Sequence, residues 1–174
     1  LESVAISMAE IDNNMTIEEF KERKAELINS LKVASKPVTG QYASYINETD
    51  VDDDSDVETF TALHLKSILK RWEDVPIILR TGKMLHDDFF DIHFKFKNHK
   101  SISKDFKNMI TFRISPNSGV SVRLIDKEND TKNFHEVDLT HCYKDSEISD
   151  AYTSLLAAII EEDHKFFVSF DEVI

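Results

Sequence analysis

Short segments between residues 76 and 141 alternate apolar with polar side chains, and polar turns separate them. The clearest case is Asp91–Lys97, in which three apolar residues alternate with His93 and two lysines. Successive side chains of a strand point to opposite faces, so this alternation predicts a strand with one buried face. The other predicted strands are Pro76–Thr81, Met109–Ser115, its hairpin partner Val120–Ile125, and a weaker one at Glu136–His141.

Helical patterns occur toward both ends of the chain. Thr16-Ile17-Glu18-Glu19 fits a capping box, in which a threonine and a glutamate satisfy each other's backbone N–H groups. Apolar residues then recur at the helical period over residues 17–32, with Lys24 as the one polar residue on that face. Residues 149–161 show the same period, with Ser149 as the candidate cap.

Residues 57–72 fit two structures. Apolar residues from Val57 to Trp72 could form one face of a helix, whereas Thr59-Phe60-Thr61 and the apolar residues that follow it could form a strand. The local pattern leans slightly toward the helix.

Strands with short connections, flanked by helices, predict an α+β fold. We expect a large, mostly antiparallel β-sheet with helices packed on one face, in a single domain over residues 1–174. Hydrophobic residues make up 41% of the sequence, which is enough for a core.

The formal net charge of −12 argues against nucleic acid and anionic membrane as partners, since both attract clustered lysine and arginine. No apolar run approaches the ~18 residues of a membrane span, and no signal peptide is visible. The single cysteine fits a reducing compartment, so we expect a cytoplasmic protein. The chain begins at Leu1 rather than methionine, with the spacing of a helix end over Leu1–Met8, so we expect a fragment of a longer protein.

The acidic residues predict solvated surfaces rather than a metal or acid–base site. In an EF-hand calcium loop counted from Asp50, glycine is needed at position six and glutamate at position twelve, but Ser55 and Thr61 occupy these positions. We interpret residues 50–56 as a solvated acidic loop. Glu161-Glu162-Asp163 and Asp171-Glu172 are interpreted in the same way.

The histidines and the cysteine give no site either. His86, His93 and His99 lack the tight spacing of metal ligands, so no metal is expected. His141 and Cys142 would face opposite sides of a strand, which prevents a nucleophile–base pair.

The chain contains only three glycines, Gly40, Gly82 and Gly119. The usual dinucleotide site needs a glycine-rich turn between a strand and a helix. No such turn exists here, so the chain is not expected to hold NADP or NAD by itself.

Trp72-Glu73-Asp74-Val75-Pro76, followed by Leu79-Arg80-Thr81-Gly82-Lys83, resembles the R-W-x-G-V-P-F-x-L-R-T-G-K segment of the glucose-6-phosphate dehydrogenase family. Other segments resemble family motifs in the same order, over nearly the whole chain: Gly40-Gln41-Tyr42 (R-G-Q-Y), Thr59–Leu63 (T-F-A-A-L), Asn108–Pro116 (N-x-L-x-x-R-I-Q-P), Asp150–Leu156 (D-A-Y-E-R-L-L) and Asp171-Glu172 (D-E).

The resemblance implies the C-terminal, substrate-binding and dimerisation domain of such an enzyme. It implies a strand within residues 57–72 and a homodimer that forms through the β-sheet. The family's dinucleotide-binding domain and general-base histidine would precede Leu1, so the fragment alone should be inactive and should carry no catalytic residue.

The resemblance also implies a sugar-phosphate contact. Lys83 matches a family lysine that contacts the substrate, and its expected role is a charged hydrogen-bond donor that orients glucose 6-phosphate. The family has a second contact, lysine or arginine, where this chain has Asp88. A third contact, glutamine in the family, is Ser115 here.

Arg80 and Arg113 match arginines that eukaryotic members use to hold a second, structural NADP. Two other positions of that site are Phe89 and His93 here, so we expect no second nucleotide site and interpret both arginines as structural.

The function implied is oxidation of glucose 6-phosphate to 6-phosphogluconolactone with NADP or NAD, in the pentose phosphate pathway. The alternative is a diverged, non-catalytic assembly module, which Asp88 and Ser115 and the missing cofactor domain would favour.

Overall fold

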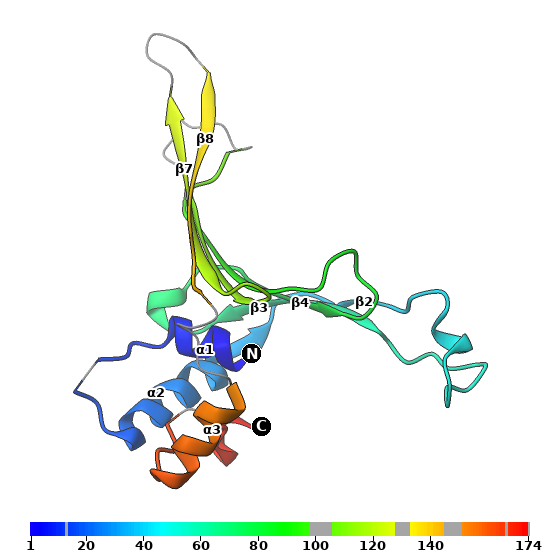
Figure 1. Cartoon of the computed structure of the whole chain (residues 1–174), viewed down its shortest axis with the longest axis horizontal. Helices are drawn as coiled ribbons and strands as arrows, with labels where there is room; N and C mark the ends of the chain where they lie inside the picture. Colours follow the sequence, from blue (N-terminus) through cyan, green and yellow to red (C-terminus); the bar gives the residue numbers. More distant parts are fainter. Residues whose placement is uncertain (13, 98–105, 128–132, 145–150, 166, 174) are drawn as a thin grey trace. The chain divides into compact units, whose positions relative to one another are not determined.

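The fold is α+β with antiparallel sheets, which confirms the predicted class. The computed structural model describes residues 1–12, 14–97, 106–127, 133–144, 151–165 and 167–173. The chain divides into two units (Figure 1). The first comprises Leu1–His86 with Leu156–Ile174, and the second is Asp87–Leu155. The single domain over residues 1–174 stays a prediction.

Two helices open the first unit, α1 (Glu2–Met8) and α2 (Ile17–Ser30). The predicted capping box is confirmed: the Glu19 N–H donates to Thr16 Oγ1 at 3.2 Å, and the Thr16 N–H donates to Glu19 Oε2 at 2.8 Å. Helix α2 ends two residues before the predicted boundary because Leu31 begins a strand.

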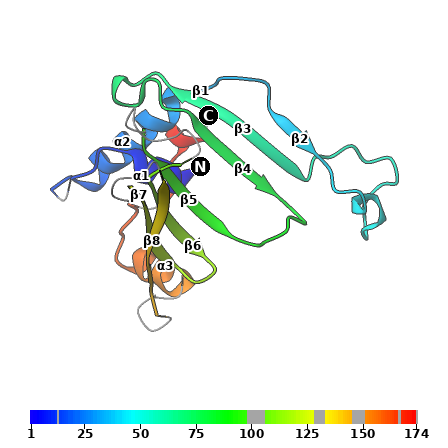
Figure 2. The ribbon, with the colours of Figure 1, turned by 90° about the horizontal axis from the view of Figure 1, so that it is seen from above.

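The sheet of the first unit is built around β3 (Phe60–Ser67). Strand β4 (Ile77–Gly82) pairs antiparallel along one edge of β3. The short strands β1 (Leu31–Val33) and β2 (Val38–Gly40) pair with opposite ends of the other edge (Figure 2). Residues 57–72 therefore contain a strand, as the family resemblance implied, followed by the 3₁₀ turn η2 (Lys70–Trp72).

The core of this unit lies between α1, α2 and one face of the sheet (Figure 1). Its buried members come from both layers: Ala5, Met8, Leu27, Leu65 and Ile77. Alternate residues of β4 point the other way, and Ile78 is 63% exposed. Within this unit the helices thus cover one face of the sheet, as predicted.

The 3₁₀ turn η4 (Phe170–Glu172) packs on α2, and the last part of α3 (Ala151–Ile160) belongs to the same unit. Lys24 Nζ lies 2.9 Å from Glu172 Oε2, and both side chains are fully buried. The prediction of a solvated Asp171-Glu172 face is therefore wrong for Glu172, because Lys24 compensates its charge inside the unit. The predicted cap Ser149 lies outside the described residues.

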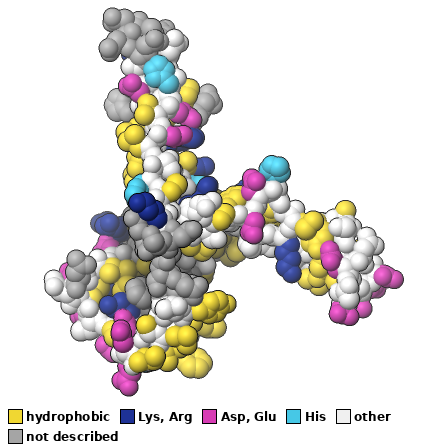
Figure 3. All heavy atoms as spheres, in the orientation of Figure 1, with side chains coloured by type: hydrophobic (Ala, Val, Ile, Leu, Met, Phe, Trp, Pro, Cys, Tyr) yellow, Lys and Arg dark blue, Asp and Glu magenta, His cyan; other side chains and the backbone are white. Residues whose placement is uncertain are grey.

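The second unit is a four-stranded antiparallel meander in the order β5-β6-β7-β8. Its strands are β5 (Phe90–Lys95), β6 (Met109–Ser115), β7 (Gly119–Lys127) and β8 (Phe134–Cys142). All four were predicted, β6 with its observed bounds. The visible face of the β7–β8 hairpin mixes hydrophobic with charged side chains (Figure 3), and Leu139 is 59% exposed. No helix in the described part of the chain is long and apolar enough to span a membrane.

Candidate functional site

Lys83 directly follows the last residue of β4. Its backbone N–H donates to the Thr59 carbonyl oxygen at 2.8 Å, which fixes the chain at the margin of the sheet. Its side chain is exposed, and no ion pair or hydrogen bond joins its amine to another described residue. The ammonium group is therefore available to an anion from solution.

Glycine is needed before Lys83 because the chain approaches β3 closely there. Gly82 pairs with Phe60, and a Cβ at position 82 would lie 2.8 Å from Phe60 Cδ2 and 3.3 Å from the Thr59 carbonyl oxygen. The chain then turns at Met84, which has a φ of 52°. Lys83 is thus held between a close strand contact and a left-handed turn residue.

Asp88 and Ser115 lie in the second unit, whereas Lys83 lies in the first. Ser115 ends β6 and pairs with Phe90, two residues after Asp88. Both side chains are exposed. The two departures from the family pattern thus occur at the same end of the β5–β6 pair.

Arg113 is engaged within the sheet of the second unit. Its Nε and Nη2 donate to the two carboxylate oxygens of Asp91, each at 3.1 Å, and the Asp91 side chain is only 4% exposed. These hydrogen bonds, with the carboxylate charge, raise the pKa of Arg113. The Asp91 contact, which the sequence did not reveal, supports a structural interpretation of Arg113.

The other positions of the family's second nucleotide site are Arg80, Phe89 and His93. Arg80 is exposed on β4, opposite Ala62 of β3. His93 Nδ1 lies 2.9 Å from the hydroxyl oxygen of Thr111, and Phe89 is apolar.

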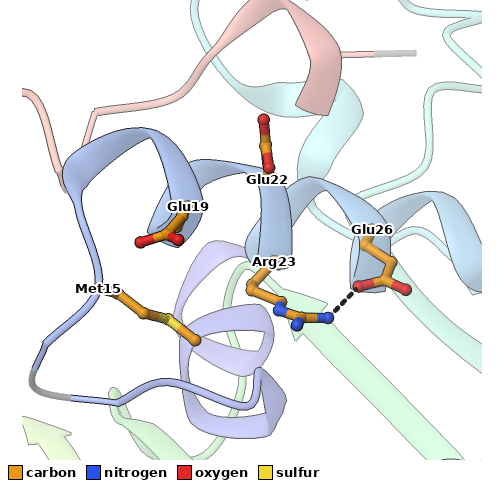
Figure 4. Close-up of a pocket in the computed structure, with 5 residues that line it drawn as sticks. All are labelled: Met15, Glu19, Glu22, Arg23 and Glu26. Carbon is orange, nitrogen blue, oxygen red and sulfur yellow. Dashed lines mark hydrogen bonds and ion pairs between the residues drawn. The ribbon is translucent and has the colours of Figure 1, made fainter.

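Two pockets lie in the first unit, and Lys83 lines neither. The larger, of about 410 Å³, is lined by Met15 and α2 residues that include three glutamates (Figure 4). Arg23, the one cation there, forms an ion pair of 3.1 Å with Glu26. The smaller pocket, of about 200 Å³, lies beside Trp72 and Arg71. The carboxylates of the larger pocket would repel a phosphate.

The described residues contain no group of three or more histidine, cysteine, aspartate or glutamate side chains placed to bind a metal. His141 contacts the ring of Tyr143, with centroids 5.1 Å apart, while Cys142 between them in β8 is exposed. His99 lies outside the described residues.

Comparison with known proteins gives a match over the whole chain. Residues 1–174 match the family model described as glucose-6-phosphate dehydrogenase, C-terminal domain. The glucose-6-phosphate 1-dehydrogenase of Kluyveromyces lactis is 34% identical over 79% of this chain, and its Schizosaccharomyces pombe counterpart gcd1 is 30% identical over 99%. The chain spans 29% and 40% of these proteins.

Solved structures show the same similarity. Glucose-6-phosphate 1-dehydrogenase from Mycobacterium avium matches 99% of this chain with a TM-score of 0.81 and 25% identity. A glucose-6-phosphate dehydrogenase in complex with its substrate glucose-6-phosphate matches 98%, with a TM-score of 0.83 and 25% identity. The chain covers 39% of each of these two structures.

Proposed function

Because the chain belongs to the family of glucose-6-phosphate dehydrogenase C-terminal domains, we propose that it is the substrate-binding and dimerisation part of such an enzyme. The intact enzyme oxidises glucose 6-phosphate to 6-phosphogluconolactone, with NADP or NAD as the oxidant. The observation that carries this proposal is the family match over the full 174 residues.

Lys83 is the substrate contact in this proposal. Its exposed ammonium follows a strand end that two features fix, the Lys83–Thr59 backbone hydrogen bond and the close approach of Gly82 to β3. A lysine there donates charged hydrogen bonds to oxygens of the sugar phosphate and so orients the sugar.

The three glycines of this chain do not form the phosphate-binding turn of a dinucleotide site. Gly40, Gly82 and Gly119 all lie in β-strands, at strand ends that pair with other strands. None of them opens a helix toward a pyrophosphate. NADP or NAD is therefore held by residues outside this chain, and the chain alone has no dehydrogenase activity.

Self-association is the second role. In this proposal the homodimer forms through the β5–β8 sheet. Its β7–β8 hairpin supplies apolar area for the contact through the exposed side chains of Leu124, Val137 and Leu139. A cytoplasmic location agrees with the exposed free thiol of Cys142 and with a relative from Arabidopsis thaliana that is named cytoplasmic.

The test is a steady-state assay of NADP and NAD reduction by the full-length protein with glucose 6-phosphate. Lys83→Met should raise KM for glucose 6-phosphate by about 10- to 100-fold, the size of a charged hydrogen bond. Lys66→Met, which removes another exposed lysine of the same sheet, is the matched control and should change KM little.

Unchanged kinetics in Lys83→Met would remove Lys83 from the site. A full-length protein that dimerises but reduces neither nucleotide would instead support the non-catalytic assembly module.

A further inference from the structure

Three backbone segments meet at Thr59, the residue before β3. The Thr59 N–H donates to the Gly40 carbonyl oxygen at 2.9 Å, and Thr59 Oγ1 accepts from the Tyr42 N–H at 3.0 Å. On its other side, the Thr59 carbonyl oxygen accepts the Lys83 N–H at 2.8 Å. Thr59 is only 8% exposed, so these bonds are largely shielded from water. One residue thus joins the Gly40–Tyr42 segment to the proposed substrate lysine.

The long loop between β2 and β3 is closed next to this junction. Gln41 Nε2 donates to the carbonyl oxygens of Ser55 at 2.8 Å and of Val57 at 3.0 Å. Hydrogen bonds from Gln41 thus connect the start of the loop to its end, just before Thr59. The Gly40-Gln41-Tyr42 motif, which the sequence analysis left without a role, anchors the loop and holds the Thr59 side chain.

The Lys83 side of the junction has little room to move. Gly82 already lies so close to Phe60 and to the Thr59 carbonyl oxygen that no Cβ fits there without displacement. Because the Lys83 N–H donates to the Thr59 carbonyl oxygen, a shift of Thr59 would move the backbone that carries Lys83. Displacements on the order of 1 Å at a positioning contact are large enough to weaken substrate orientation.

We propose that Thr59 is a positioning residue for Lys83, acting through its hydroxyl contact to Tyr42 and its carbonyl contact to Lys83. This inference rests on the proposed function, because it concerns how the lysine is presented to glucose 6-phosphate. In this proposal Thr59 acts through Lys83 rather than by contacting the substrate. The hydrogen bond between the Thr59 hydroxyl and the Tyr42 N–H holds Thr59 in place. Its carbonyl oxygen therefore stays in position to accept the Lys83 N–H.

The experiment compares Thr59→Val with Thr59→Ser in the full-length enzyme, each alone and combined with Lys83→Met. Valine keeps the size of threonine but loses the acceptor, whereas serine keeps the acceptor. Thr61→Val makes the same change two residues further along β3 and is the matched control. Glucose 6-phosphate KM and kcat are measured, and hydrogen exchange of the peptide that contains Lys83 reports its backbone bond.

We expect Thr59→Val to raise KM by up to about tenfold, because a displaced lysine orients the sugar phosphate less well, with kcat within about twofold and faster exchange at Lys83. Thr59→Ser should stay close to the unmodified enzyme. In the Lys83→Met background, Thr59→Val should add no further rise in KM, because the lysine through which it acts is gone.

The inference is overturned if Lys83→Met raises KM but Thr59→Val does not, or if Thr59→Val raises KM equally in both backgrounds. That result leaves the proposed function intact. An unchanged KM in Lys83→Met itself defeats the site assignment, and the positioning role of Thr59 with it.

Discussion

Replacing Lys24 with methionine should destabilise the first unit strongly, because Lys24 forms a buried ion pair with Glu172. The Lys24 ammonium lies 2.9 Å from the Glu172 carboxylate and 3.3 Å from the Phe167 carbonyl oxygen. Both charged side chains are fully buried. Lys24→Met keeps the apolar stem in the core but removes the cation that lies beside the Glu172 carboxylate.

The magnitude follows from burial. Removing one partner of a buried ion pair costs about 3–5 kcal/mol, because an uncompensated charge remains inside. The adjacent residue provides the contrast: Arg23 pairs with Glu26 at 3.1 Å, but these side chains are 50% and 52% exposed. Losing such an exposed pair costs less than about 1 kcal/mol. Lys24→Met and Arg23→Met therefore test burial at neighbouring positions of one helix.

The assay is thermal unfolding of the full-length protein, together with limited proteolysis of the segment around Glu172. Lys24→Met should lower Tm clearly and should speed cleavage near the C-terminus, while Arg23→Met should change both little. Lys24→Met combined with Glu172→Leu should recover most of the loss, since no buried charge is left. Equal effects of Lys24→Met and Arg23→Met would refute the reasoning.

Two further predictions concern charge. Asp88→Lys restores a cation where the family has lysine or arginine, and should lower the glucose 6-phosphate KM by about 5- to 10-fold. Asp87→Lys makes the same charge change one residue earlier and is the matched control. An equal effect of both variants would contradict a specific role of position 88 and would indicate a general charge effect. Arg123 donates hydrogen bonds to Asp138 at 2.7 and 2.8 Å, and these bonds lower the pKa of the Asp138 carboxyl group. The pair therefore stabilises the β7–β8 hairpin at pH values above the unfolded-state pKa of about 3.9. This stabilisation is lost as the pH falls through the lower folded-state pKa. Arg123→Leu should raise the pKa of Asp138 in an NMR titration, and an unchanged pKa would contradict the assignment.

Local patterns predicted the fold where neighbouring residues determine the structure. Strand Met109–Ser115 and the Thr16 capping box follow from alternation and from cap chemistry, both of which are local. The strands β1 and β2 were not predicted, because each is three residues long and they flank Pro37. Their pairing is set by β3, further along the chain.

Contacts between distant segments could not be predicted from the sequence. Lys24 stood out as a polar residue on an apolar helix face, but its partner Glu172 lies at the other end of the chain. Thr59 was marked only by a family motif, and its hydrogen bonds to Tyr42 and Lys83 depend on how β2, β3 and β4 pair. Lys83 was identified by resemblance, and its exposure at the end of β4 agrees with the role proposed for it.

The most direct test of the proposed role of Lys83 is a crystal structure of the full-length protein with glucose 6-phosphate bound, in which the distance from Lys83 Nζ to the nearest substrate oxygen is measured. We predict a hydrogen bond of about 2.7–3.2 Å. A bound sugar phosphate whose oxygens are contacted by other cations, with Lys83 Nζ directed into solvent, would contradict that role.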